Sequence, residues 1–153
     1  MKHRREIDGL RALAILPVLL FHAGFSWMPG GFFGVDIFFV ISGFLITGII
    51  VNELHRDGKF SIIGFYERRA RRIMPALFLV IIVMYPVGWF LLFPNEWSNF
   101  CQSLVSIIYF ASNYFFLSKT GYFDPNIDLN PMLHTWSLAI EEQFYLFFPL
   151  ILW

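Results

Sequence analysis

Long apolar runs alternate with short polar segments along the 153 residues of this chain. A helix needs about 20 mostly apolar residues to cross the hydrocarbon core of a bilayer. Runs of this kind predict membrane spans at residues 10–27, 34–51, 73–93, 99–117 and 134–153. The pattern therefore predicts an all-α fold, a polytopic bundle of four or five transmembrane helices in one domain.

The fourth run is the weakest of these predicted spans. Its polar side chains are Gln102, Ser103, Ser106, Ser112 and Asn113. Such a segment is either a span packed inside the bundle or a re-entrant segment, and the pattern does not choose between them. The sequence Pro29-Gly30-Gly31 and the polar residues 118–133 predict connecting turns and a loop.

The composition supports a membrane protein, because 58% of the residues are hydrophobic and 20% are aromatic. Soluble domains contain roughly 45–50% apolar residues. The formal net charge of zero gives no reason to expect a nucleic acid partner. A single cysteine, Cys101, excludes an intrachain disulfide and lacks the spacing of a zinc or iron–sulfur site, so no metal is expected. The N-terminus resembles a signal peptide, but Arg11 interrupts it and no cleavage site follows, so we expect a retained first span.

Basic residues indicate the orientation in the membrane. They gather before the first run and between the second and third, at Lys2, Arg4, Arg5, Arg56, Lys59, Arg68, Arg69, Arg71 and Arg72. Residues 23–33 and 94–98 contain none. Because short cytoplasmic loops carry an excess of lysine and arginine, the N-terminus and the connection before residue 73 are predicted to be cytoplasmic.

Two ionisable residues share one face of the first predicted span. Arg11 and His22 stand about three helical turns apart. Taken singly, Arg11 could snorkel to the interface and His22 could be an interfacial residue. A pair of costly intramembrane groups instead indicates function, and a neutral imidazole can act as base or nucleophile near pH 7. Asp36 opens the second run, where a helix dipole favours a carboxylate, so capping is its simplest role.

Four arginines precede the third run: Arg68, Arg69, Arg71 and Arg72. One interpretation is a positively charged anchor at the cytoplasmic boundary. On a helix, however, Arg68, Arg69 and Arg72 would point in one direction, and guanidinium groups suit phosphate. The other interpretation is therefore a site for a phosphate-bearing cytosolic cofactor or an anionic lipid headgroup.

The last run places Glu141, Glu142 and Gln143 roughly 10–13 Å along an apolar helix. A charged carboxylate at the centre of a membrane helix costs about 2.5–3.5 kcal/mol on insertion scales. One polar face of this helix consists of His134, Ser137, Glu141 and Tyr145. We expect that face to point into the bundle, where it is either a site or a purely structural hydrogen-bond network. No nucleophile elbow surrounds Ser137, so a hydrolase triad is not expected.

Four stretches of the chain together resemble one family, the acyltransferase-3 membrane acyltransferases. They are "REIDGLRALAILPVLLFH", "GGFFGVDIFFVISGFLIT", "FYERRARRIMPAL" and "HTWSLAIEEQFYLFFP", in this order. The resemblance implies a multi-pass enzyme of the bacterial inner membrane. Such an enzyme moves an acyl group from cytoplasmic acetyl-CoA or another acyl-CoA to a hydroxyl of a glycan, such as lipopolysaccharide O-antigen or peptidoglycan.

The resemblance also implies roles for individual residues. The basic-x10-His motif of the family falls on Arg11 and His22, and the Arg-x-x-Arg motif on Arg69 and Arg72. His22 would be the base or the acyl carrier, with Arg11 and Glu141 as catalytic partners. The residues implied in binding the CoA phosphates are Arg68, Arg69, Arg71 and Arg72. The Ser-Leu-x-x-Glu-x-Gln-Phe-Tyr motif of the family falls on Ser137, Leu138, Glu141, Gln143, Phe144 and Tyr145. The residues that we expect to support the substrate are Asp36, His134, Ser137, Glu142, Gln143 and Tyr145.

The chain stops at Trp153, inside its fifth apolar run, whereas the family continues for about as many residues again. We therefore expect the chain alone to be inactive, or to be one part of an assembly with the remaining helices. The expected partners are acyl-CoA, a glycan acceptor and the lipid bilayer. The acceptor and the acyl chain stay open. The alternatives are a proton-coupled transporter, a non-catalytic membrane interaction protein, and another polytopic acyltransferase superfamily with a membrane histidine.

Overall fold

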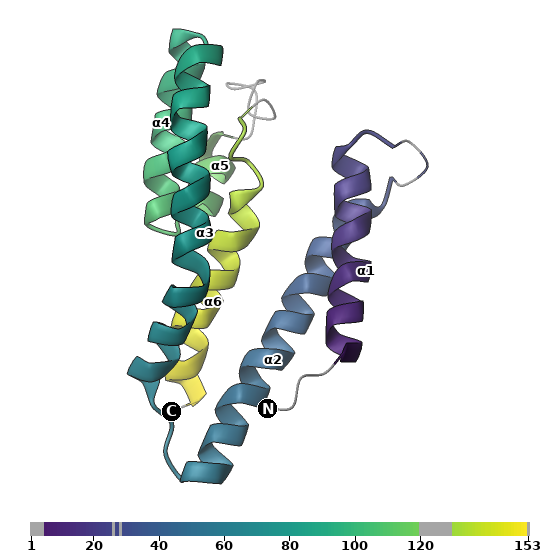
Figure 1. Cartoon of the computed structure of the whole chain (residues 1–153), viewed down its shortest axis with the longest axis vertical. Coiled ribbons are helices and arrows are strands. Elements are labelled where there is room, and N and C mark those ends of the chain that lie inside the picture. Colours follow the sequence, from purple (N-terminus) through teal and green to yellow (C-terminus); the bar gives the residue numbers. More distant parts are fainter. Residues whose placement is uncertain (1–4, 26, 28, 120–129, 153) are drawn as a thin grey trace. The chain divides into compact units, whose positions relative to one another are not determined.

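The computed structural model describes residues 5–25, 27, 29–119 and 130–152, and this part of the chain is helical, with connecting turns. Its elements are α1 (Arg5–His22), the 3-10 turn η1 (Gly31–Phe33), α2 (Gly34–Asp57), α3 (Ile62–Leu91), α4 (Pro94–Ile108), α5 (Ser112–Lys119) and α6 (Thr135–Leu152) (Figure 1). They form two compact units, Met1–Phe60 and Ser61–Trp153. The predicted all-α fold is confirmed.

Two of the described helices are long and apolar enough to cross a membrane. They are Gly31–Asp57, which joins η1 to α2 and has a mean hydropathy of 2.3, and Ile62–Leu91, with 2.2. The helices α1 and α6 have 18 residues each and carry charged side chains, which lower their hydropathy. Length and composition thus identify two candidate membrane spans among the described residues. The four or five spans expected from the sequence stay a prediction.

In the first unit, glycines at the start of the second helix let it approach α1 closely. A Cβ atom at Gly31 would overlap the carbonyl oxygen of Pro17, and one at Gly34 would overlap that of Ala14. Ala14 is fully buried, with 0% of its surface exposed. Backbone therefore packs directly on backbone here, as small residues allow between membrane helices.

Replacing Gly34 with alanine is expected to destabilise this unit by about 1–3 kcal/mol, because the added methyl group meets backbone that cannot move aside. The measurement is thermal unfolding of the detergent-solubilised protein. Gly9→Ala is the matched control, since a Cβ there meets nothing within 4 Å and alanine favours a helix. Equal melting temperatures of the two variants would contradict the close approach.

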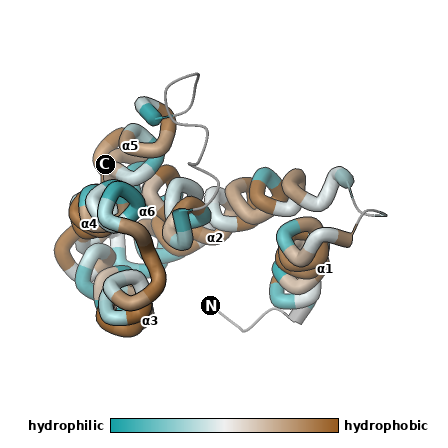
Figure 2. Tube along the Cα trace, turned by 90° about the horizontal axis from the view of Figure 1, so that it is seen from above, coloured by the Kyte–Doolittle hydropathy of each residue, from teal (hydrophilic) through white to brown (hydrophobic). Residues whose placement is uncertain are grey.

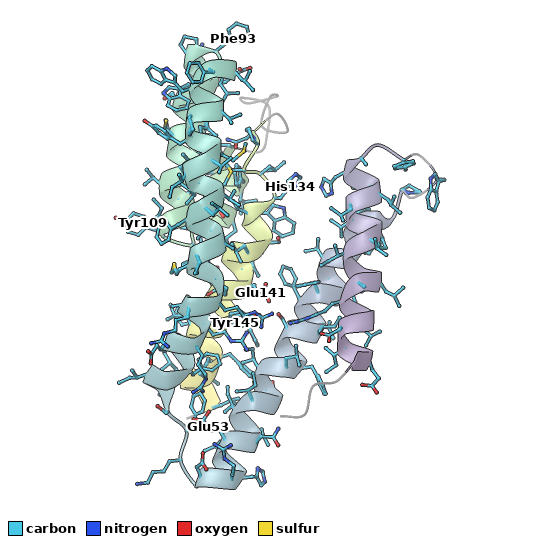
Figure 3. The ribbon with its side chains drawn as sticks, viewed as in Figure 1. Glu53, Phe93, Tyr109, His134, Glu141 and Tyr145 are labelled. Atoms are coloured by element: carbon cyan, nitrogen blue, oxygen red, sulfur yellow. The ribbon has the colours of Figure 1, made fainter. Side chains whose placement is uncertain are left out.

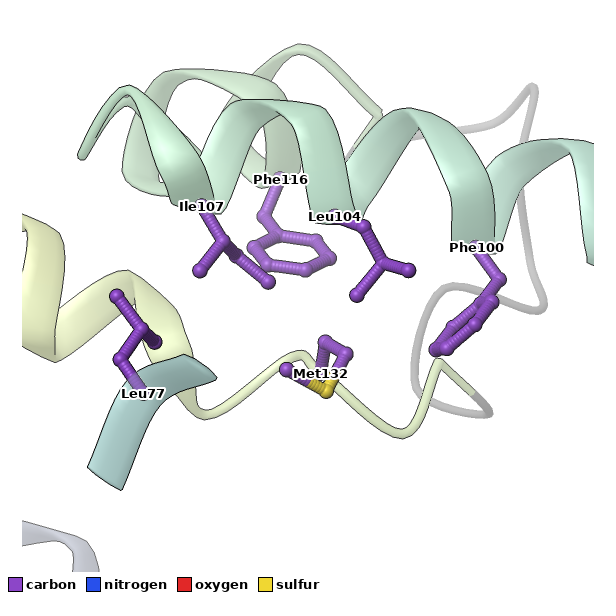
Figure 4. Packing of buried hydrophobic residues seen from close by; sticks show 6 residues of the cluster. All are labelled: Leu77, Phe100, Leu104, Ile107, Phe116 and Met132. Atoms are coloured by element: carbon purple, nitrogen blue, oxygen red, sulfur yellow. The ribbon is translucent and has the colours of Figure 1, made fainter. Parts of the chain in front are cut away.

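The second unit is built along α3, the 30-residue helix. Its buried apolar cluster joins α3, α4, α5 and the segment before α6, and consists of Leu77, Phe100, Leu104, Ile107, Phe116 and Met132 (Figure 4). Large hydrophobic side chains of α3 are exposed, Ile82 and Phe90 among them, and hydrophobic stretches of this helix are brown in Figure 2. An apolar exposed surface of this kind suits contact with lipid.

The predicted span 99–117 is not one helix, because the chain turns between α4 and α5. Phe110 adopts a left-handed conformation with φ of 50°. The N–H of Ala111 donates to the carbonyl of Ser106 at 2.8 Å, and that of Phe110 to Ile107 at 3.0 Å. This is the Schellman pattern of a helix end, with phenylalanine where glycine is usual.

The two helices beside this turn run antiparallel and form a hairpin (Figure 1). Lys119 Nζ, at the end of α5, lies 3.4 Å from Asn99 Oδ1, near the start of α4. With 15 residues, α4 is about 22 Å long, which is less than the roughly 30 Å of a bilayer core. Neither α4 nor α5, which has eight residues, is long enough by itself to cross such a core.

Candidate functional site

A cavity of about 540 Å³ lies in the second unit, between α3, α6 and the turn that joins α4 to α5. Its size falls within the roughly 300–1,000 Å³ of small-molecule sites. Its lining combines many aromatic rings with a few charged groups. The lining residues are Tyr66, Arg69, Ala70, Met74, Tyr109, Phe110, Ala111, Tyr114, Glu142, Gln143, Tyr145, Leu146 and Phe147. We refer to this cavity as the α3–α6 pocket.

Arg69 supplies the positive charge of the α3–α6 pocket. Its guanidinium carbon lies 5.0 Å from the ring centroid of Tyr145 on α6 and 5.6 Å from that of Phe65 on α3. A cation over an aromatic face gains about 0.5–2 kcal/mol, depending on its exposure to water. The two rings therefore fix the direction of a side chain that would otherwise extend into solvent.

Tyr145 connects this arginine to the polar face of α6. Its side chain is buried, and its hydroxyl donates a hydrogen bond to Glu141 Oε1 one helical turn away (Figure 3). Tyr66 on α3 donates from its hydroxyl to the carbonyl oxygen of Leu146 at 2.6 Å. These contacts hold the N-terminal half of α3 against α6 and so set the width of the pocket.

Glu142 contributes a carboxylate with unused hydrogen-bonding capacity. Its Oε1 atom is buried and accepts no hydrogen bond from any described residue. Glu141 and Glu142 both interact electrostatically with Arg69, which offsets part of the cost of burying charge. The pocket therefore pairs a fixed cation with an acceptor that a ligand hydroxyl or amide N–H could satisfy.

Unlike Glu142 Oε1, the side-chain amide of Gln143 is fully engaged in hydrogen bonds within the protein. Its Nε2 donates to the carbonyl oxygen of Phe110 at 2.8 Å and to Asn113 Oδ1 at 3.0 Å. Its Oε1 accepts from Asn113 Nδ2 at 3.1 Å. The amide of Gln143 thus joins α6 to the tip of the α4–α5 hairpin.

Two further residues of the predicted polar face, His134 and Ser137, lie at the start of α6. His134 is exposed just before the start of α6 (Figure 3). The hydroxyl of Ser137 donates to the carbonyl oxygen of His134 at 3.0 Å, which is a local bond at the helix start. Of the predicted polar face, Glu141 and Tyr145 are joined by a hydrogen bond. His134 and Ser137 lie apart from them, at the start of the helix.

Three of the sequence-predicted residues, Arg11, His22 and Asp36, lie in the first unit. His22 is exposed at the end of α1, and its Nδ1–H donates to the carbonyl oxygen of Val18 at 2.7 Å. This bond assigns the lone pair to Nε2, the atom a base or nucleophile needs. The guanidinium carbon of Arg11 lies 5.8 Å from the ring centroid of Phe38, and its buried Nε has no hydrogen-bond partner among the described residues. Asp36 is exposed in the first turn of α2, as a dipole-favoured carboxylate would be.

Comparison with known proteins adds to this geometry. The family profile described as "Acyltransferase domain", that of the acyltransferase-3 proteins, matches residues 4–153. The chain belongs to the acyltransferase-3 family. The O-acetyltransferase OatA of Staphylococcus aureus strain NCTC 8325 / PS 47 is 40% identical over 148 residues, which cover 95% of this chain and 24% of OatA. In strain MSSA476, the protein named "Putative O-acetyltransferase SAS0844" is 38% identical over 152 residues, 99% of this chain and 25% of its own length.

The chain therefore spans about a quarter of the length of the curated relatives it matches. No solved structure matches it. The predicted resemblance to the acyltransferase-3 family is confirmed.

The four neighbouring arginines of this acyltransferase-3 chain differ in their exposure to solvent. Arg69 is half-buried and turns into the α3–α6 pocket, whereas Arg68, Arg71 and Arg72 are exposed. Arg71 forms an ion pair with Glu67 one turn earlier, at 2.6 Å. Packing against α6 therefore covers Arg69 more than its three neighbours, and the expectation that Arg68, Arg69 and Arg72 point in one direction stays a prediction.

Several pocket residues of this acyltransferase-3 chain were not predicted from the sequence. Tyr66 stands three positions before Arg69 in the same motif stretch, so helical spacing could have placed it beside the arginine. Tyr109 and Tyr114 reach the pocket only because the chain turns back between them. No spacing rule signals that turn.

Proposed function

We propose that this chain forms part of a membrane-bound O-acetyltransferase that moves an acetyl group from acetyl-CoA to a hydroxyl of a cell-envelope glycan. The observation that carries the proposal is the acyltransferase family match over residues 4–153. The names of the similar O-acetyltransferases support the acetyl group and the oxygen acceptor. The α3–α6 pocket supplies chemistry that fits the donor.

The donor is proposed to enter beside Arg69. A guanidinium stays charged at every physiological pH and forms forked bonds with phosphate oxygens. The exposed Arg68 and Arg72, which precede and follow it on α3, would hold the more outlying phosphates of CoA. The aromatic walls of the pocket and the spare acceptor on Glu142 suit a chain that carries amide N–H groups, as the thioester arm of acetyl-CoA does.

The proposed reaction moves one acetyl group from the thioester sulfur of acetyl-CoA to the oxygen of the acceptor hydroxyl. The acceptor oxygen attacks the thioester carbonyl carbon, the carbon–sulfur bond breaks, and the hydroxyl proton passes through His22 Nε2 to the leaving thiolate. In a second route the imidazole takes the acetyl group first and then passes it to the acceptor. Both routes give an O-acetyl ester and free CoA thiol. Arg11 and Glu141 are proposed as further catalytic residues of this transfer.

The excess of basic residues before α1 and between α2 and α3 supports a cytoplasmic N-terminus in a bacterial inner membrane. The donor-facing arginines would then lie on the side where acetyl-CoA is made. The acceptor glycan would lie on the opposite side.

The proposal is tested by equilibrium binding of radiolabelled acetyl-CoA to the detergent-solubilised protein. Saturable binding that unlabelled CoA displaces is expected. Dephospho-CoA should compete less well, because it lacks a phosphate that an arginine would contact. An absence of saturable binding would contradict the proposed enzyme function. The alternative, a proton-coupled transporter, would instead show substrate uptake driven by a pH gradient.

A further inference from the structure

We propose that Gln143 is a positioning residue. Together with Asn113, it holds residues 94–119 as a membrane hairpin that turns back at Phe110 and forms one wall of the α3–α6 pocket. This assignment gives a specific form to the substrate-support role that the resemblance implies for Gln143.

The hydrogen bonds of Gln143 are the first support. A glutamine side chain has two N–H donors and one carbonyl acceptor. In this structure Nε2 donates to Phe110 O and Asn113 Oδ1, while Oε1 accepts from Asn113 Nδ2. Both donors are used inside the protein, so a substrate could gain a donor from this amide only by breaking one of these bonds.

The turn at Phe110 is the second support. A left-handed conformation is unfavourable for a bulky side chain, so it persists only where the surroundings hold it. Helix α4 also ends here, which leaves carbonyl oxygens without partners in their own helix. Gln143 satisfies the carbonyl of Phe110 itself, the residue with the left-handed backbone.

The depth of the turn explains why such a partner is needed. An aromatic cluster lies at the connection between α3 and α4. The ring centroid of Trp97 is 5.1 Å from that of Tyr85 and 5.3 Å from that of Trp89. Clusters of tyrosine and tryptophan are typical of a membrane–water interface. From that connection α4 runs for 15 residues, about 22 Å, so its end lies within a hydrocarbon core of roughly 30 Å.

Non-helical backbone at this depth is tolerated only where protein groups satisfy it. The amide of Gln143 does so from α6, and Ser112 adds a second tie, because its hydroxyl donates to the carbonyl oxygen of Thr135 at 2.9 Å. The hairpin tip carries Tyr109, Phe110 and Ala111 into the pocket lining. A displaced tip would therefore open or distort the pocket without removing any charged group from it.

The first experiment measures on which side of the membrane the two ends of the hairpin lie. Asn95→Cys and Ser118→Cys are introduced singly in a Cys101→Ser background, and intact cells are treated with a membrane-impermeant maleimide. Asn95 and Ser118 are both exposed at the ends of the hairpin. The same labelling pattern for both positions is expected. Labelling of one position in intact cells and of the other only after permeabilisation would overturn the hairpin.

The second experiment tests Gln143 itself with Gln143→Glu, which keeps the shape of the side chain but removes both donors. The matched control is Gln102→Glu, on the exposed side of α4. In the folded protein that remains, assayed within an acetyl-transferring assembly that contains this chain, the KM for acetyl-CoA is expected to rise about tenfold for Gln143→Glu and less than about twofold for the control. A purely structural role would reduce the amount of folded protein and leave its KM unchanged, and that result would overturn the positioning role.

This second readout rests on the proposed function, whereas the labelling experiment does not. If wild-type protein binds no acetyl-CoA, the proposed function fails. The hairpin is then still decided by the labelling of the two positions, and the role of Gln143 by repeating that labelling in Gln143→Glu. Unequal labelling is expected there, and an unchanged pattern would overturn the role.

Discussion

In an acetyl-transferring assembly that contains this chain, His22→Ala is expected to abolish acetyl transfer to the acceptor while leaving the binding of acetyl-CoA intact. Positioned acid–base groups contribute about 10²–10⁴-fold to a rate, and an acyl-carrying imidazole would be indispensable. The bond from Nδ1 to the carbonyl oxygen of Val18 presents Nε2 as the reactive atom, and alanine removes that atom. The measurement is the acetyl content of the glycan fraction, together with labelled acetyl-CoA binding to the same preparation.

The chain offers a matched control for this histidine. His55 is also exposed, and its Nδ1–H donates to the carbonyl oxygen of Val51, four residues earlier, at 2.8 Å. His55→Ala removes the same local bond from α2 and is expected to leave transfer unchanged. Equal losses in both variants would show that the bond to the helix matters rather than the chemistry of the imidazole. Normal transfer by His22→Ala would remove the residue from the mechanism.

The helices could be predicted from the sequence because their signal is local. A run of apolar residues near 20 in length has few other stable forms. The helices α2 and α3 contain most of the predicted runs and extend beyond them through residues 52–57 and 62–72, where charged and apolar residues mix. The joined pair of Glu141 and Tyr145 could also be predicted, since four residues separate them on α6.

The turn between α4 and α5 could not be predicted in the same way. Glycine or proline usually marks a break, but the left-handed residue here is Phe110. Its stabilising partner, Gln143, lies 33 positions further along the chain. A contact of that separation has no periodic signature, so the sequence left the segment open between a span and a re-entrant hairpin.

The close approach of α1 and α2 shows a related limit. The sequence indicated a turn around Gly31, since glycine and proline are common in turns. The structure shows that Gly31 and Gly34 are also required as helix contacts, because each lies against a carbonyl oxygen of α1. Whether a position must be glycine depends on the segment that packs against it. The sequence around the glycine does not show which segment that is.

The arginines show how packing selects among equivalent residues. Spacing alone treats Arg69 and Arg72 as members of one face. The structure distinguishes them, because the ring of Tyr145 covers Arg69 while Arg72 remains exposed. A residue half-buried against a pocket has less freedom to lose when a ligand binds, so it contributes more to affinity than an exposed one.

Arg69→Gln is therefore expected to weaken acetyl-CoA binding about 10–100-fold, the loss of roughly 1.4–2.8 kcal/mol that a charge-assisted bond supplies. Arg56→Gln is the matched control, since it removes the same charge from an exposed side chain that pairs with Asp57 at 2.8 Å. Its effect should stay below about twofold, because exposed ion pairs contribute little. Binding is measured with labelled acetyl-CoA at two salt concentrations. Equal weakening by both substitutions would mean that the total positive charge attracts the donor, and the assignment of the donor phosphates to Arg69 would then be wrong.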